Sequence, residues 1–154
     1  LAPLAQSGGL GDALAGLARA LAARGHEVVT LLPAYRTTLA QPACPRLEDA
    51  GNVRLAGPFG EIRGRWLAGE LAPRLGLRLL DLPEFYDRAD LYGFADDAAR
   101  FISFARAVAL RTHEERPDLL VAHDWHAALS AVALLALPEE VAVNAVLNRH
   151  VELR

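Results

Sequence analysis

The stretch Ser7-Gly8-Gly9-Leu10-Gly11-Asp12 opens an alanine-rich amphipathic run near the start of the chain. Its glycines leave backbone N–H groups that no side chain shields, and a helix beginning there adds about half a positive charge. Such a turn suits an anion. It matches neither standard phosphate signature, because Leu14 stands where the dinucleotide pattern needs glycine and the Walker A pattern needs lysine. A turn made only for packing is the alternative interpretation.

The residues after the glycine turn predict the second half of a βαβ unit. Apolar residues recur at helical spacing from about Gly9 to Arg24, and Gly25 is a stop signal. The apolar positions are Leu10, Leu14, Leu17, Ala18 and Leu21. Glu27 to Leu32 has the β-branched, apolar character of a strand buried on both faces. Leu1 to Ala5 looks like the tail of a buried strand that enters the turn.

The middle of the chain predicts a β-meander. Short apolar runs separated by Gly and Pro cover residues 52–56, 62–71 and 77–82. We expect a loop over residues 34–51 with a short helix around Arg46 to Ala50. Trp66 is expected in the core rather than as a platform for sugar stacking. The loop from Pro83 to Asp97 allows two interpretations, a binding loop or a surface loop with Phe85 and Tyr86 tucked beneath it.

The second half predicts two more helices separated by a buried strand. A helix is expected from about Asp97 to Glu115, with Asp96 or Asp97 as its cap. Its buried face is expected to carry Phe101, Ile102, Ala105, Val108, Ala109 and Thr112. After Pro117, the run Leu119 to Ala122 predicts a strand and Ala127 to Leu137 a helix, and a last strand is expected over Val141 to Leu147.

The tetrapeptide His123-Asp124-Trp125-His126 lies where the strand over 119–122 ends. Ligands of open parallel sheets bind at the carboxyl ends of the strands, which favours a functional interpretation. The alternative is that Asp124 merely caps the next helix. Zinc is disfavoured because the sequence shows no separate third ligand, so no metal site is expected.

Composition narrows the class of protein. The chain has 154 residues, 53% of them hydrophobic, and a net charge of −3, which predicts one globular domain. All sixteen cationic residues are arginines and they are scattered, so no face for nucleic acid is indicated. No apolar run reaches the roughly 18 residues of a membrane span. The single cysteine, Cys44, fits a reducing cytoplasm, where we expect the protein.

Three segments together resemble one family. Leu4-Ala5-Gln6-Ser7-Gly8-Gly9-Leu10-Gly11-Asp12 is followed by Ala22-Ala23-Arg24-Gly25-His26-Glu27-Val28, and some hundred residues later by Pro117-Asp118-Leu119-Leu120-Val121-Ala122-His123-Asp124-Trp125-His126. This order is similar to the amino-terminal domain of bacterial glycogen synthases and plant starch synthases.

The resemblance implies an α/β fold, a Rossmann-like three-layer sandwich with a mostly parallel sheet, forming the N-terminal half of a GT-B glycosyltransferase. Residues 1–154 would be the acceptor-side domain, with a C-terminal nucleotide-binding domain outside this chain. Such hexosyltransferases move glucose from ADP-glucose, or in some members UDP-glucose, to the non-reducing end of an α-1,4-glucan. They retain the anomeric configuration and use no metal or other cofactor. This chain alone is expected to be inactive.

The resemblance also implies roles for individual residues. The donor's diphosphate would lie against the glycine turn, with Gln6, Ser7, Gly8, Gly9 and Asp12 as donor-binding residues. Asp124 and His150 would be catalytic. The pocket and acceptor side would be formed by His123, Trp125, His126 and Tyr92.

Two departures from the family pattern are visible. The family places lysine where Gln6 stands, and a neutral amide brings no positive charge to a phosphate. The family's Thr-x-His-Asn segment is replaced by Asn148-Arg149-His150. Two interpretations are open: His150 is the family's histidine displaced by one residue, or the sequence has diverged or lost residues there. A catalytically silent glucan-binding or regulatory module is therefore an alternative function, and a nucleotide-sugar enzyme of another GT-B family is a third.

Overall fold

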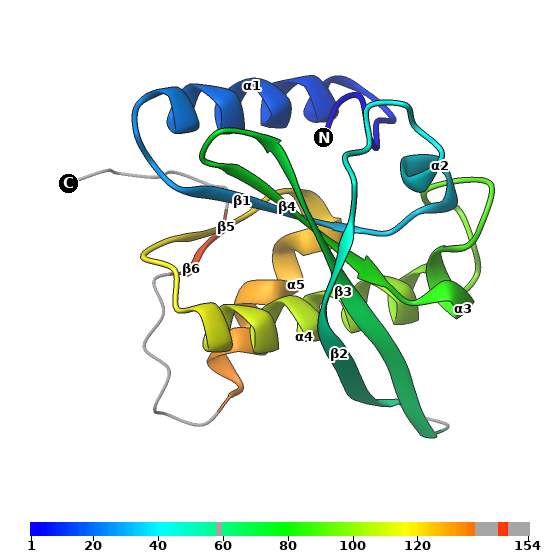
Figure 1. Cartoon of the computed structure of the whole chain (residues 1–154). Helices are drawn as coiled ribbons and strands as arrows, with labels where there is room; N and C mark the ends of the chain where they lie inside the picture. Colours follow the sequence, from blue (N-terminus) through cyan, green and yellow to red (C-terminus); the bar gives the residue numbers. More distant parts are fainter. Residues whose placement is uncertain (58–59, 138–144, 148–154) are drawn as a thin grey trace. The chain divides into compact units, whose positions relative to one another are not determined.

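The computed structural model describes residues 1–57, 60–137 and 145–147. The chain divides into two compact units, Leu1–Gly93 and Phe94–Arg154. Figure 1 shows the helices and strands of both units. Among the described residues, no helix is both long enough and apolar enough to cross a membrane.

The first unit is built on a four-stranded mixed sheet (Figure 1). Its strands are β1 (Val28–Pro33), β2 (Glu48–Gly57), β3 (Gly60–Ala72) and β4 (Leu75–Asp81), in the order β1-β4-β3-β2. β3 pairs antiparallel with both β2 and β4, which confirms the meander. On its other side β4 pairs in parallel with β1. The sheet thus joins a parallel Rossmann-like pair to an antiparallel hairpin extension.

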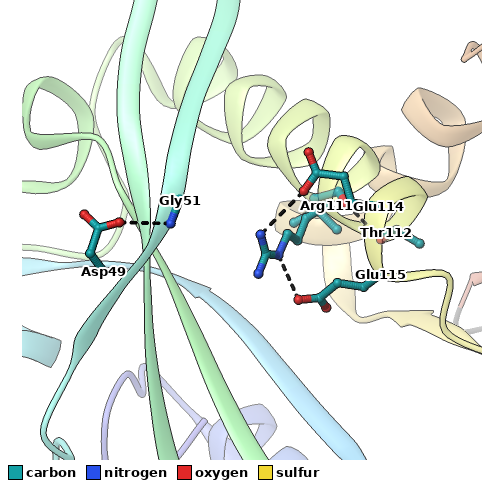
Figure 2. Close-up of polar contacts among 7 residues, drawn as sticks. Asp49, Gly51, Arg111, Thr112, Glu114 and Glu115 are labelled. Atoms are coloured by element: carbon teal, nitrogen blue, oxygen red, sulfur yellow. Dashed lines mark hydrogen bonds and ion pairs between the residues drawn. The ribbon is translucent and has the colours of Figure 1, made fainter.

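The expected helix around Arg46 to Ala50 is wrong, because β2 begins at Glu48. Glu48 pairs with Ala68 of β3, and the register shifts between Asp49 and Asn52. Gly51 has φ of 110° within this irregularity, and its N–H donates to the Asp49 carboxylate over 3.0 Å (Figure 2). β2 is an edge strand of the sheet. Edge strands often carry charged residues, so the sequence of this segment does not show the apolar pattern of a strand.

Helix α1 (Gly9–Ala23) confirms the predicted helix, but its buried face is only partly the predicted one. Ala18 is buried as expected, and Leu14 and Leu21 are half-buried. Gly11, Ala15 and Ala18 are its buried residues, whereas Leu10 and Leu17 are 41% and 45% exposed. Small side chains let a helix approach a sheet closely, and α1 packs on β1 and β4 in this way (Figure 1). The prediction placed the large apolar side chains in the core. In the structure the small residues are buried, because they let the helix backbone come close to the sheet.

The segment before α1 is not the expected strand tail. Residues 1–7 form turns, in which the Ala5 N–H donates to the Leu1 carbonyl. Leu1 and Leu4 are 8% and 2% exposed and join the core cluster with Ala15, Ala34, Leu77 and Leu79. These apolar residues anchor a turn rather than a strand. β1 is also not buried on both faces, since Val29 is 41% exposed.

Two short helices connect the strands of the first unit, α2 (Arg36–Leu39) and α3 (Pro83–Tyr86). Tyr86 is fully buried, and its ring meets that of Tyr35 edge-on at 5.8 Å. Phe85 is half-buried, which supports the interpretation in which these aromatic residues tuck beneath the loop. Trp66 is 3% exposed, so the expected core position is confirmed.

The second unit contains α4 (Asp97–Glu115), β5 (Leu120–Ala122), α5 (Asp124–Leu135) and β6 (Ala145–Leu147). β5 and β6 pair in parallel as a separate two-stranded sheet. α5 begins at Asp124, three residues before the expected start at Ala127, because the last three residues of the tetrapeptide belong to the first turn of the helix, while His123 is extended. Of the strand expected over Val141 to Leu147, only 145–147 lie among the described residues.

Helix α4 matches its predicted bounds and most of its predicted buried face. Ile102 is the exception at 46% exposed. Near the end of the helix Arg111 pairs with Glu114 and Glu115, and the Thr112 hydroxyl donates to the Val108 carbonyl (Figure 2). Arg116 closes the helix with φ of 47° immediately before Pro117, which cannot continue it.

Candidate functional site

The glycine turn presents unobstructed backbone at the start of a 15-residue helix. Gly8 is the residue before α1 and Gly9 is its first residue. A Cβ built at either position would meet no heavy atom within 4 Å. The first N–H groups of a helix have no partner within the helix and carry its positive end. The turn therefore has both the space and the polarity to hold an anionic group.

Gln6 and Asp12 bridge the first turn of α1. The Gln6 side-chain amide donates to an Asp12 carboxylate oxygen over 2.6 Å, and both residues are exposed. The Gln6 side chain lies over Gly11, where an added Cβ would come within 2.9 Å of Gln6 Cγ. Gly11 is therefore needed for this arrangement. The Asp12 carboxylate also offsets part of the positive charge at the helix start.

Tyr92 comes to the glycine turn from far along the chain. Its hydroxyl hydrogen-bonds the Ser7 hydroxyl over 3.1 Å, and its side chain is 43% exposed. The family resemblance implies that Tyr92 lies on the acceptor side and Ser7 on the donor side, and the structure brings the two side chains together. Eighty-five residues separate them, so no local pattern in the sequence could have predicted this contact.

Asp124 has a strained backbone at the start of α5. Its φ is 64°, in the left-handed region, which costs a non-glycine residue about 1 kcal/mol. Its carboxylate accepts the N–H of the next residue, Trp125, over 2.6 Å. The residue before the helix is His123 and α5 has no side-chain cap, so the interpretation of Asp124 as the cap is wrong. The carboxylate nevertheless stays 46% exposed. An exposed acid held in a strained conformation is typical of a functional residue.

The two histidines of the tetrapeptide favour their neutral forms. Burial lowers the pKa of His123. Burial is also the main influence on His126 and lowers its pKa, against the opposing charges of Asp124 and Asp97, while Arg100 lowers it further. His126 Nδ1 lies 4.0 Å from an Asp124 carboxylate oxygen, too far for a hydrogen bond. The pair is therefore not a permanent ion pair near pH 7.

Helix α4 supplies an aromatic support that the sequence analysis missed. The Phe101 ring meets the Trp125 ring edge-on at 5.0 Å and the His126 ring at 4.6 Å. The Trp125 and His126 rings lie 3.8 Å apart. Phe101 was expected to be an ordinary core residue of a helix, and nothing in its spacing connects it with the tetrapeptide.

The predicted site residues are divided between the two units. Gln6, Ser7, Gly8, Gly9, Asp12 and Tyr92 belong to the first unit, and residues 123–126 belong to the second. That the glycine turn and Asp124 act on the same substrate, as the resemblance implies, stays a prediction. His150 lies outside the described residues. Within the described residues, no group of three or more His, Cys, Asp and Glu side chains is arranged to hold a metal ion.

The chain is similar to known proteins in both sequence and structure. The family model described as the starch synthase catalytic domain matches residues 1–147. The chain belongs to the starch synthase catalytic domain family. The catalytic domain of starch synthase IV from Arabidopsis thaliana, solved bound to ADP and acarbose, has a similar structure with a TM-score of 0.81. It is 29% identical, and the match covers 96% of this chain and 31% of that one. The likeness confirms the α/β, Rossmann-like fold of a GT-B catalytic domain.

Curated members of the family are similar along most of the chain. The glycogen synthase of Bordetella petrii is 45% identical over 142 residues, which are 82% of this chain and 26% of that protein. The glycogen synthase of Cereibacter sphaeroides is 39% identical over 159 residues, covering 96% of this chain and 32% of that protein. The chain thus spans about a third or less of the length of the starch synthase family relatives it matches.

Proposed function

We propose that the full-length protein containing this chain transfers glucose from ADP-glucose to the non-reducing end of an α-1,4-glucan, with retention of configuration. The observation that carries the proposal is the open glycine turn at the start of α1, in a chain of the starch synthase catalytic domain family. Backbone N–H groups there would stabilise the negative charge that builds on the donor's diphosphate as it leaves. The similar starch synthase IV domain was solved with ADP bound.

The proposed roles follow the chemistry of each side chain. Ser7, Gly8 and Gly9 face the diphosphate, with Gln6 and Asp12 fixing the turn around it. The Asp124 carboxylate acts at the reacting sugar, and the neutral imidazoles of His123 and His126 shape the pocket with Trp125. Tyr92 lies beside the turn through its contact with Ser7, with its ring toward the glucan. His150 is proposed as a further contact to the donor sugar.

The proposed domain organisation makes this chain, residues 1–154, the acceptor-side half of a two-domain enzyme. A C-terminal domain would hold the nucleotide, since this chain has no lysine and the donors of its glycine turn, the backbone N–H groups, the Ser7 hydroxyl and the Gln6 amide, are all neutral. The separate chain is therefore inactive in this proposal. A cytoplasmic location is part of it, consistent with the free thiol of Cys44.

The proposal is tested by incubating the full-length protein with ADP-glucose and glycogen and measuring the ADP released and the glucan extended. Transfer from ADP-glucose supports the proposal, and transfer from UDP-glucose alone would revise the donor. If neither nucleotide is released, the protein is not a glucosyltransferase. A parallel reaction with the separate chain is expected to release no ADP.

Gln6→Lys is expected to lower the KM for ADP-glucose, by about threefold, because it adds a positive charge beside the proposed phosphate site. The gain is limited since the new ammonium would also pair with Asp12, which now accepts from Gln6. Steady-state kinetics on the full-length enzyme measures the effect. Gln41→Lys adds the same charge at another exposed position and should leave the KM unchanged. A KM that rises in Gln6→Lys would contradict a phosphate at this turn.

The second candidate is a silent glucan-binding or regulatory module. The observation that favours it is the bond between Gln6 and Asp12, which engages the amide where the family has lysine. Such a module would migrate more slowly in an electrophoresis gel that contains glycogen than in one without it. It would release no nucleotide from ADP-glucose or UDP-glucose. The length of the reading frame separates the two candidates, because an enzyme of two domains needs roughly 400 residues or more.

A further inference from the structure

A charged and aromatic cluster lies between α4 and the start of α5 in the second unit, whose helices pack together (Figure 1). Arg100 is 0% exposed and pairs with the Asp97 carboxylate one turn earlier on α4. Its guanidinium carbon lies 4.9 Å from the centre of the Phe94 ring and 5.3 Å from that of Phe101. Asp97 also accepts the Phe94 N–H, which ties the start of the helix to the same cluster.

Burying a guanidinium is costly unless its charge is compensated. A buried leucine or methionine would fill the same space without that cost. The arginine at this position therefore requires a reason beyond packing. The reason lies in what its neighbour touches, since Phe101 is the ring that meets both Trp125 and His126. The cluster therefore forms a continuous series of contacts from a buried ion pair to the tetrapeptide that contains Asp124.

We propose that Arg100, held by Asp97, is a positioning residue that acts through Phe101 to fix His126 and Trp125 and thereby the site at the start of α5. Phe101 is 2% exposed, and its ring contacts both the Arg100 guanidinium and the His126 imidazole, so a change in its position would alter both contacts. A planar guanidinium can lie against an aromatic face while it pairs with a carboxylate, which a lysine ammonium does not reproduce. The kinetic part of this inference rests on the proposed glucosyltransferase function.

The charges of the cluster have a second effect on His126. Burial lowers the pKa of this imidazole, Asp124 and Asp97 raise it, and Arg100 lowers it. The two members of the ion pair on α4 therefore have opposite effects on the His126 pKa. A neutral His126 can accept a hydrogen bond from a sugar hydroxyl, whereas a protonated one cannot.

The first experiment measures the titration of His126 in the full-length protein by NMR, with labelled histidine and with His126→Gln to assign the signal. Arg100→Met is expected to raise the His126 pKa, and Asp97→Asn is expected to lower it, because the first removes a nearby positive charge and the second a nearby negative one. Arg100→Lys keeps the charge and should leave the pKa near the wild-type value. Arg106→Met, at an exposed position of the same helix, is the matched control and should change nothing.

Opposite shifts distinguish positioning from simple loss of structure. A disordered helix start would expose His126 to water in both variants, and the pKa would move up toward 6.5 in each. Equal upward shifts, or no shift in either variant, would overturn the inference. This readout needs no enzymatic activity, so it stands even if the protein transfers no glucose.

The second experiment measures kinetics with ADP-glucose and glycogen. Arg100→Lys and Phe101→Leu are expected to lower kcat about tenfold while the KM for ADP-glucose stays within a factor of about two, because the donor contacts are proposed at the glycine turn. Phe101→Leu also carries the test if Arg100→Met does not fold. The acidic limb of the kcat profile should move up in Arg100→Met and return toward wild type in Arg100→Lys. A KM effect with unchanged kcat would contradict positioning.

Discussion

Asp124→Asn is expected to lower kcat for glucosyl transfer about 10²- to 10³-fold in the full-length protein, with little change in thermal stability. The transition state of glycosyl transfer carries positive charge on the sugar, which a carboxylate stabilises and a neutral amide does not. The Asp124 side chain is 46% exposed, so its charge contributes little to the core. Asparagine also tolerates the left-handed backbone that Asp124 adopts at φ of 64°.

The choice of variants separates chemistry from backbone strain. Asp124→Gly relieves the left-handed strain, and it should raise the melting temperature or leave it unchanged while activity is still lost. Asp118→Asn removes the same charge from an exposed position before β5 and should keep full activity. Melting curves recorded beside ADP-release assays provide both measurements. Full activity in Asp124→Asn would remove this carboxylate from the proposed mechanism.

Gly9→Ala is expected to raise the KM for ADP-glucose about tenfold or more, equivalent to about 1.4 kcal/mol of donor binding. The free protein has room for the added methyl group, since nothing lies within 4 Å of a Cβ at Gly9. The fold should therefore tolerate the change, and alanine is the better helix former. The space that accepts the methyl group is the space proposed for the diphosphate, so only the bound state should suffer.

Gly16→Ala provides the control for this prediction. Gly16 lies in the same helix, is exposed, and also has nothing within 4 Å of its built Cβ. The change should stabilise the protein by about 0.5–1 kcal/mol and leave the KM unchanged. Denaturant unfolding and donor titration of both variants complete the comparison. An unchanged KM in Gly9→Ala would place the diphosphate elsewhere.

Local patterns predicted the elements of this chain well. The helices over 9–23 and 97–115, the meander and the strand before the tetrapeptide all occur where periodicity and turn residues predicted them. Periodicity fails where packing depends on the absence of a side chain. Ala15 and Ala18 are buried in α1 while Leu17 is exposed, because contact with the sheet is made by the close approach of the helix.

The same division applies to the candidate site. The glycine turn and the tetrapeptide could be found in the sequence, since a helix start after glycines and a polar segment after a buried strand are both local signals. The contact of Tyr92 with Ser7 could not be found in this way, and neither could the contacts of Phe101 with Arg100 and His126. An arginine in an amphipathic helix is expected on the solvent-exposed face, and only the folded structure shows that Arg100 is buried.

The sequence by itself determined the family, the order of the elements and the two motifs that carry the proposed chemistry, because these depend on residues close together in the chain. The tertiary structure decided which helix face is buried, that Asp124 adopts a left-handed backbone, and which side chains support the histidines. These features depend on contacts between segments that are far apart in the sequence. Such contacts form only when the chain is folded, so no local pattern in the sequence shows them.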